Sequence, residues 1–313
     1  MAFAQGSRSN LAYTAESTFG TTPANTQLAY LPINSHSLDL TKERVQGNEI
    51  QSDRMPRVDR HGNRQIGGTI ECDLRKGDFD ELLESAMMSS FSTNVLKVGS
   101  TPKFFTMEDG ALDIDYYRAF TGCHVGGASF SMAPNQMVTA SFDVIGKDMT
   151  IGQVSKSQAS DGTENTPSAS SSNAPFDSYS GDVREGGTGS SDVINLVTSL
   201  EFSITNNLSP TFVIGSDAAQ AINAGRAVVE GTVTVYYEDD TLINKFLDET
   251  ETSLQVSVDD PTGSNPYTFN FPRIKYNGAS VPLADESSRL ITLPFVSLYD
   301  SSEGTNLKIT RTA

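Results

Sequence analysis

The sequence predicts a mainly β protein made of two tandem β-sandwich or half-barrel units, each with one short α-helix. Three observations support this fold class. Apolar and polar residues alternate with a period of two in both halves, and one stretch in each half follows the helical period instead. Short segments of the first half also recur, in the same order, in the second. At 313 residues, the chain has the length of about two domains.

Four alternating segments predict half-buried strands, in which every second side chain enters the core. The first is the clearest, because apolar Ile70, Cys72 and Leu74 are separated by charged residues. The same alternation occurs over residues 112–117, 138–144 and 232–237. Each half therefore supplies strands that bury one face and expose the other.

One short helix is expected in each half, where the alternation stops. In the first half, Asp78 and Glu81 occupy the N-cap and N3 positions of a capping-box-like start. In the second half, the acidic residues 238–240 would lie at a helix N-terminus, where the helix dipole favours them. The residues expected on the two apolar helix faces are Phe79, Leu82, Leu83, Ala86 and Met87, and then Ile243, Phe246 and Leu247.

The recurring segments favour a tandem duplication over the generic similarity of β-rich chains. The matched pairs are 37–40 with 199–202, 68–72 with 231–235, 78–83 with 241–247, 127–129 with 278–280, and 139–142 with 292–295. We therefore expect a first unit with an N-terminal arm over residues 1–150 and a second unit with a C-terminal arm over 193–313. Residues 151–192 between them are rich in Ser and Gly, and we expect a flexible loop or linker there.

The charge balance excludes several classes of protein. Lys and Arg number 22 against 39 Asp and Glu, so the net charge is −17. Such a chain repels nucleic acids and anionic membrane surfaces. No apolar run approaches the ~18 residues of a membrane span, so we expect no membrane insertion. Cys72 and Cys123 are far apart, which predicts buried thiols in a protein made in a reducing cytoplasm.

Recognisable catalytic and cofactor motifs are absent from the sequence. It has no glycine-rich nucleotide-binding motif, no zinc-protease motif and no nucleophile elbow. His36, His61 and His124 are widely spaced, so their spacing does not predict a metal site. We therefore expect neither catalysis nor a cofactor or metal.

One segment departs from the acidic average. Residues 51–64 carry two Asp and four arginines, Arg54, Arg57, Arg60 and Arg64, a net charge of +2. A basic segment with Pro and Gly between two strands is typical of an exposed loop. Its arginines could form bidentate pairs with carboxylates on another copy of the chain. A solvated, charged hairpin is the other interpretation, and composition alone does not choose between them.

Several stretches resemble the major tail tube proteins of long, non-contractile-tailed (siphovirus-type) bacteriophages. They are LAYTAESTFGTTPA at 11–24, NEIQSDR at 48–54, GGTIE at 67–71 and DFDELLE at 78–84. The likeness is strongest over residues 8–90 and weaker beyond. It implies a structural virion protein of the phage tail, assembled in the host cytoplasm. Its β domains would join neighbouring copies into ring-shaped β-barrels that stack into a tube for DNA delivery into a bacterial host.

The resemblance also implies partners. Rings with six tube domains would need three two-unit chains with pseudo-sixfold symmetry, and six chains per ring is the alternative. The tape-measure protein, and later the passing double-stranded DNA, would occupy the lumen. Tail terminator and tail-tip proteins would bind the ends of the tube. The loop at about residues 45–66, with Arg54, Arg57, Arg60 and Arg64, would contact the next ring.

The polar strand faces supply candidates for the lumen. From alternation alone, these are Glu71, Asp73, Asp113, Asp115 and Asp143. Acidic walls would not hold DNA, which carries about one negative charge per 1.7 Å of its axis. The same faces could instead point outward.

A two-domain β-sandwich binding module, of the adhesin or carbohydrate-binding type, is the alternative function. Such modules usually present exposed aromatic side chains, often Trp. The chain contains no Trp, which counts against this alternative.

Overall fold

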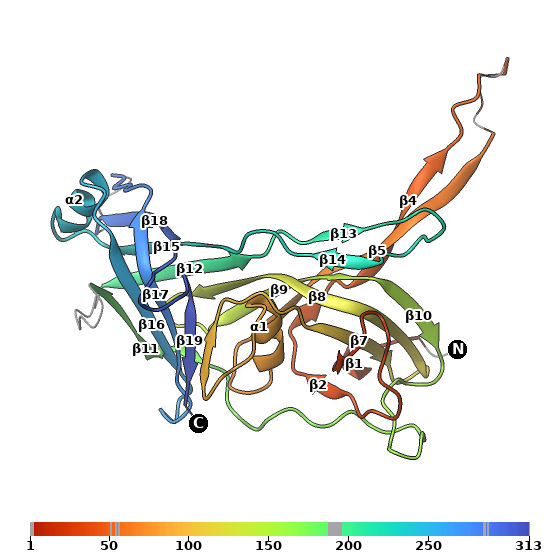
Figure 1. Cartoon of the computed structure of the whole chain (residues 1–313). Coiled ribbons are helices and arrows are strands. Elements are labelled where there is room, and N and C mark those ends of the chain that lie inside the picture. The colour runs from red at the N-terminus through yellow and green to blue at the C-terminus, as the bar shows by residue number, and fades with distance from the viewer. Residues whose placement is uncertain are drawn as a thin grey trace.

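The structure is a computed structural model that describes residues 3–50, 52, 53, 55, 57–186, 196–283, 286 and 288–312. It is mainly β and its strand pairs are antiparallel, as Figure 1 shows. The elements up to residue 152 are η1 (Gly6–Arg8), β1 (Ser9–Glu16), β2 (Ala29–Leu31), β3 (Ser35–His36), β4 (Asp39–Gln46), β5 (Asp59–Asp73), α1 (Asp80–Ala86), β6 (Val95–Lys97), β7 (Phe104–Ala111), β8 (Tyr116–Met132), β9 (Thr139–Gly146) and β10 (Asp148–Gly152). The remaining elements are β11 (Asp177–Gly186), β12 (Val197–Thr205), β13 (Ser209–Thr211), β14 (Ala221–Asn223), β15 (Val228–Tyr236), α2 (Thr241–Leu247), β16 (Thr252–Asp259), β17 (Tyr267–Tyr276), β18 (Leu290–Ser297) and β19 (Lys308–Arg311).

A central sheet runs through the whole molecule. Its strands pair in the order β4–β5–β9–β8–β12–β15–β18–β17. We call the first four strands the N-terminal array and the last four the C-terminal array. The pairing of β8 with β12 is the junction between them. Within the described part of the chain the sheet does not close into a barrel, and its two edges are β4 and the segment that follows β17.

The same pairings occur in both arrays and in the outer sheets beside them. Strand β8 begins between β7 and β10 and ends in the central sheet, and β17 likewise begins between β16 and β19. Strand β1 pairs with β7 as β11 pairs with β16. These long, shared strands tie each outer sheet to the central one.

Two glycines mark equivalent points of the arrays. A Cβ atom at Gly68 would lie 2.5 Å from the carbonyl oxygen of Ser37, and one at Gly231 would lie 2.5 Å from that of Glu201. The next residues, Leu38 and Phe202, are therefore equivalent. The sequence match of 37–40 with 199–202 was thus two residues out of register, because short alternating segments look alike after a shift of two.

One apolar core spans both arrays. Phe130 of β8 stacks on Phe202 of β12, with ring centroids 4.8 Å apart across the junction. Both rings contact Phe269 of β17, at 5.2 and 5.1 Å. Aromatic pairs of this kind add to the stabilisation from burial. Packing, and not only the intervening segment, therefore holds the two halves together.

The prediction that Cys72 and Cys123 are buried is confirmed, and both thiols are free.

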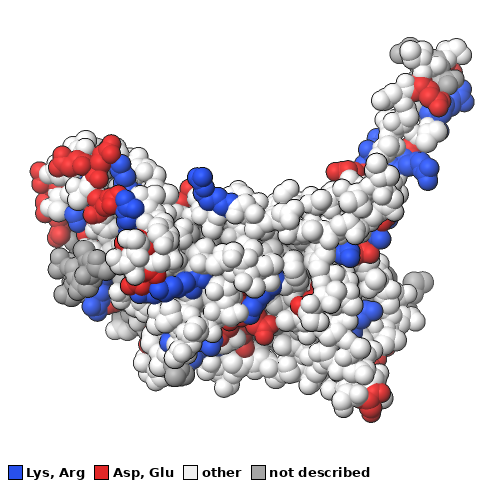
Figure 2. Space-filling model, in the orientation of Figure 1, with Lys and Arg blue, Asp and Glu red and all other residues white. Residues whose placement is uncertain are grey.

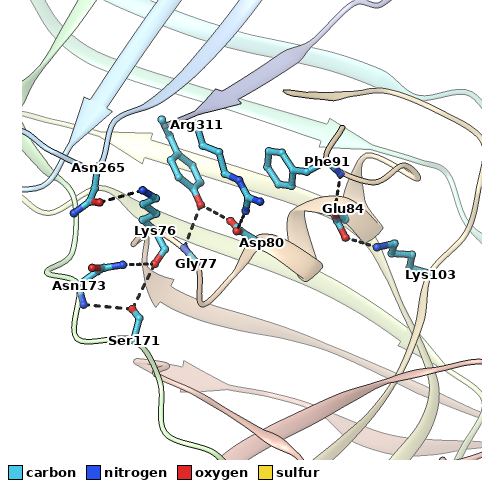
Figure 3. Close-up of polar contacts among 11 residues, drawn as sticks. Lys76, Gly77, Asp80, Glu84, Phe91, Lys103, Ser171, Asn173, Asn265 and Arg311 are labelled. Carbon is cyan, nitrogen blue, oxygen red and sulfur yellow. Dashed lines mark hydrogen bonds and ion pairs between the residues drawn. The ribbon is translucent and has the colours of Figure 1, made fainter. Parts of the chain in front are cut away.

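A second set of contacts joins α1 to the C-terminal part of the chain (Figure 3). Asp80 accepts hydrogen bonds from the Tyr267 hydroxyl and from Arg311. The Arg311 guanidinium lies 4.1 Å from the centre of the Phe91 ring. Nearby, β6 pairs with β19. Because the halves are attached here as well as at the junction, their relative orientation is fixed at two places.

Several expectations about local structure are wrong. Residues 112–115 form a turn between β7 and β8 rather than a strand, and Asp115 has a φ of 50°. The alternation of apolar and polar residues suggested a strand, but the polar residues belong to the turn. The helix at α1 is confirmed, but Phe79 is its N-cap and the Asp78 side chain instead accepts hydrogen bonds from Ser171. On α2, Leu247 is exposed rather than packed.

The segment after residue 150 is more structured than expected. Residues 177–186 form β11, which pairs with β16. Phe176 is fully buried, and its N–H donates to the Leu74 carbonyl at 2.8 Å. The composition of the segment did not predict this strand, because the segment is mostly polar and is held in place by one buried aromatic residue and by neighbouring strands. Residues 187–195 lie outside the described part of the chain. No described helix has the length and apolar character needed to cross a membrane.

We expect Phe130→Ala to lower the free energy of unfolding of the unassembled protein by about 3–5 kcal/mol, because it removes a ring that both arrays share. Chemical denaturation should show one transition for the whole chain. Tyr179→Ala, which truncates an exposed aromatic, is the control and should change the free energy by less than about 0.5 kcal/mol. Two separate transitions would contradict a shared core.

His124 makes stability depend on pH. Its Nδ1 donates to the Lys103 carbonyl at 2.9 Å, and its buried Nε2 has no partner among the described residues. Burial lowers the pKa of His124, so below about pH 6.5 the unfolded chain binds the proton more readily than the folded chain.

Stability should therefore fall as the pH drops below about 6.5, by up to about 1.4 kcal/mol per pH unit. Chemical denaturation at about pH 7.5 and 5.5 measures this dependence. His124→Asn keeps a donor toward Lys103 but does not titrate, so it should lose less stability on acidification. Equal losses in both proteins would show that His124 is not responsible.

Candidate functional site

The outward face of the central sheet forms a polar groove. Alternation sends one set of side chains into the core and the other set to this face. The groove has a volume of about 770 Å³. Three carboxylates line it, those of Glu71, Glu201 and Glu230, and no described Lys, Arg or His does. The groove therefore presents negative charge without a cation to balance it.

Rows of small polar side chains cross the groove from strand to strand. The first row, in register order, is Glu71, Ser141, Ser129, Ser203 and Glu230. The second row is Asp73, Thr139, Ser131, Glu201 and Thr232. Both rows continue through the junction, so the two arrays form one surface. Serine and threonine make this surface hydrophilic without large projecting groups.

The carboxylates of the N-terminal array bind neutral donors. The Ser35 hydroxyl donates to Glu71 at 2.8 Å, and the Asn34 amide donates to Asp73 at 3.0 Å. Such contacts orient a carboxylate without cancelling its charge. Partial burial raises the pKa of the third carboxylate of this array, that of Asp143.

The structure brings together three of the five carboxylates that alternation proposed. Glu71, Asp73 and Asp143 lie on the outward side of β5 and β9. Asp113 and Asp115 do not join them, because both lie in the turn between β7 and β8 in an outer sheet. There Asp113 accepts a hydrogen bond from the backbone N–H of Gln5 at 2.8 Å.

Sequence reasoning missed two acidic residues of the groove. Glu201 follows Leu200 on β12, and Glu230 follows Val229 on β15, so both are the polar members of alternating segments. The signal was present in the sequence. What no local pattern could supply was that β12 would pair with β8 and bring these carboxylates beside Glu71.

A long hairpin formed by β4 and β5 projects from the body, as Figure 1 shows. We call the described residues between 41 and 64, which include the outer parts of β4 and β5, the arm. Its strands stay paired out to Gln46 and Asp59, and Arg44 forms an ion pair with Asp59 at 2.7 Å. Side chains of both charges gather on it, and others gather around α2 (Figure 2). Apolar residues on the arm are also exposed, namely Val45, Ile50, Met55 and Val58.

The four predicted contact arginines have different environments. Arg57 forms an ion pair with Asp53 within the arm, and Arg60 is exposed with no ion-pair partner among the described residues. Arg64 binds Asp148 at 3.1 Å and Asp217 at 3.3 Å. Arg54 lies outside the described residues. Arg64 therefore fastens the base of the arm inside the chain, whereas Arg57 and Arg60 lie farther out.

A shorter hairpin occupies the corresponding place in the C-terminal array. It is formed by β13 and β14 between β12 and β15, and its tip exposes Val213 and Ile214. The Arg64 N–H donates to the Asp217 carbonyl at 2.7 Å, so this hairpin lies against the base of the arm. Both projections carry exposed apolar groups.

The described residues contain no group of three or more His, Cys, Asp or Glu arranged to hold a metal ion. The candidate site is a polar groove with two hairpins nearby.

Comparison with known proteins identifies a family. No curated protein matches the chain. The sequence model of one family, described as phage tail tube protein, matches residues 6–297, which is nearly the whole chain. The resemblance seen in the N-terminal motifs is thereby confirmed. The chain belongs to the phage tail tube protein family.

Proposed function

We propose that this protein assembles with itself into stacked rings that form a phage tail tube, a conduit for DNA delivery into the bacterial host. The polar groove carries the proposal most directly. It is a continuous, acidic face of small side chains on a sheet whose two edges are open. A lone chain leaves those edges unsatisfied, whereas closure into a ring removes them.

The proposed ring contains three chains. Each chain supplies two arrays of four strands, so three chains give 3 × 2 = 6 arrays and 3 × 8 = 24 strands around the channel. The arrays are proposed to be tandem copies of one tube unit, since the same pairings occur in both. A ring of six chains, with half of the arrays outside the lumen, is the alternative.

The polar groove would face the lumen. Its carboxylates would repel DNA, and its hydroxyl groups would keep the wall wetted and smooth. Screening at physiological salt acts over about 8 Å, so only charges close to the wall affect the passing polymer. We assign this role to Glu71, Asp73, Asp143, Glu201 and Glu230, and not to Asp113 and Asp115, which lie in an outer sheet.

The arm would reach the next ring. Arg57 and Arg60 supply cations toward a protein that is acidic overall, and exposed Ile50 and Met55 supply apolar contact area. Arg64 would act indirectly, by fixing the base of the arm through Asp148 and Asp217.

The remaining partners are those that the resemblance to tail tube proteins implies. We propose that the tape-measure protein and then double-stranded DNA occupy the lumen, and that terminator and tip proteins bind the tube ends. The protein would be part of the virion tail after assembly in the host cytoplasm. A binding module of the adhesin type is less well supported, because the groove offers no exposed aromatic platform.

Electron microscopy of the concentrated, purified protein tests the proposal. Stacked rings with an open channel and threefold averages are expected. True sixfold averages would keep the tube and reject the ring of three chains. If only single particles form, even when purified tail tips are added as nuclei, the tube function is contradicted.

Reversing charge in the groove should make the tube bind DNA. We expect tubes of the triple variant Glu71→Lys, Glu201→Lys, Glu230→Lys to bind short duplex DNA at least about tenfold more tightly than wild-type tubes at low salt, because cations near phosphates release counterions. Fluorescence anisotropy measures this binding.

The control carries the same charge change around α2, in Glu238→Lys, Asp239→Lys and Asp248→Lys. If this control binds DNA as tightly as the groove variant, net charge and not the position of the groove explains the effect.

Charge reversal on the arm should separate ring formation from stacking. We expect Arg57→Glu with Arg60→Glu to leave rings intact but to shorten tubes several-fold, as measured by tube length in negative stain. The pair Arg57→Lys with Arg60→Lys preserves the charge and should retain most of the stacking. Tubes of normal length in the Glu variant would contradict the role of the arm.

A further inference from the structure

The two open edges of the central sheet have matching chemistry. At one edge, β5 is the only strand of the described chain that pairs with β4. At the other, the chain continues past β17 through residues 278–283, where the only described strand contact is Ser280 with Thr292 of β18. Leu283 at this edge is 77% exposed. Each edge therefore offers backbone groups, and the second also offers apolar surface, and no other described strand pairs with them.

The junction inside the chain is a template for joining such edges. Residues 127–132 of β8 pair antiparallel with residues 200–205 of β12, so that Phe130 lies opposite Phe202 and Ser129 opposite Ser203. This is the point at which the N-terminal array ends and the C-terminal array begins. The same kind of contact would have to recur wherever a C-terminal array meets the N-terminal array of another copy.

The strand pairings identify the residues that would occupy each place in this template. Ser129 lies opposite Ser141, and Ser141 in turn lies opposite Glu71. Glu71 is three residues after Gly68 in the sequence. In the same way, Ser280 lies opposite Thr292, and Thr292 lies opposite Thr234. Thr234 is three residues after Gly231 in the sequence. Since Gly68 and Gly231 are equivalent, Ser280 takes the place of Ser129.

We infer that residues 278–283 of one copy pair antiparallel with residues 36–41 of the next copy, at the end of β3 and the start of β4, in the register of the internal junction. Because Leu38 takes the place of Phe202, the register sets Val281 opposite Leu38. It also sets Ser280 opposite Asp39 and Ala279 opposite Leu40. The inference deepens the proposed function and rests on it, since it names the partner, a second copy of this chain, and the residues that join the ring.

The side chains and backbone of both edges fit this register. Leu38 and Leu40 point toward the core side of the sheet, where Val281 and Ala279 would extend the apolar layer, while Asp39 and Ser280 would extend the polar one. Ser280 exchanges backbone hydrogen bonds with Thr292 at 3.0 and 2.9 Å. Its neighbours Ala279 and Val281 therefore direct their backbone groups to the open edge.

Proline does not obstruct the pairing. Pro282 lies two residues beyond Ser280, so its missing N–H would have faced β18 and not the new partner.

In the single chain, side chains occupy some of the open backbone groups. Asp39 accepts the Leu40 N–H at 2.8 Å, and Arg289 donates to the Val281 carbonyl at 3.1 Å. Ring closure would exchange these contacts for strand hydrogen bonds.

A disulfide tests the register directly. Asp39 and Ser280 would form a non-hydrogen-bonded pair, whose Cα atoms lie about 4.5 Å apart, within the range a disulfide spans. In assembled Asp39→Cys, Ser280→Cys protein, mild oxidation should give covalent dimers and closed trimers on a non-reducing gel. The native thiols are buried and should not contribute. The control, Asp39→Cys with Pro282→Cys, is shifted by two residues and should link at least about tenfold less.

A substitution at the edge tests whether the contact is required. Leu283→Asp should abolish rings in electron microscopy, while circular dichroism shows a folded monomer, because the side chain is already exposed. Leu247→Asp is the matched control, since Leu247 on α2 is 64% exposed and lies outside both edges. Rings that form normally with Leu283→Asp would overturn the inference.

Failure of the proposed function and failure of the inferred register would give different results. If the wild-type protein forms no rings, the proposed function fails and this inference fails with it. If rings form but the 39–280 pair does not link, or the shifted pair links better, the ring is joined elsewhere and only this inference is overturned.

Discussion

The pairing of β8 with β12 is the contact on which the rest of the structure depends. It turns two four-stranded arrays into one sheet, and it places Phe130 against Phe202 so that both arrays share a core. Because the strands continue in register, the groove also continues across the junction. Without this pairing, the carboxylates of β5 and β15 would lie on separate surfaces, and neither array would supply a template for joining another copy.

Because side chains alternate along each strand, the two faces of this sheet have different roles. Inward residues such as Phe142 and Phe295 stabilise the fold, and outward ones such as Ser141 and Glu230 form the groove. The outward face contributes little to packing, so its composition is free to serve function. Small, polar and acidic residues occupy it, a choice that suits a wall along which a polyanion passes without binding.

Much of the fold could be predicted from the sequence, where local patterns and burial agree. The strands around Ile70, Phe142 and Val233 and the helix at 80–86 were predicted for this reason. The strand predicted at 112–117 was wrong because Asp113 and Asp115 serve a turn. Strand β11 was missed because its segment is polar, and its order comes from pairing with β16 and from buried Phe176.

The sequence by itself determined the mainly β class, the acidic character, the arginine-rich arm and the likeness to tail tube proteins, because periodicity, charge and local motifs are properties of neighbouring residues. Only the tertiary structure decided that β12 pairs with β8, that Arg64 serves the base of the arm, and that Glu201 joins Glu71 in one groove. These contacts link residues more than 60 positions apart. Their geometry depends on how strands meet across the sheet, which no local pattern specifies.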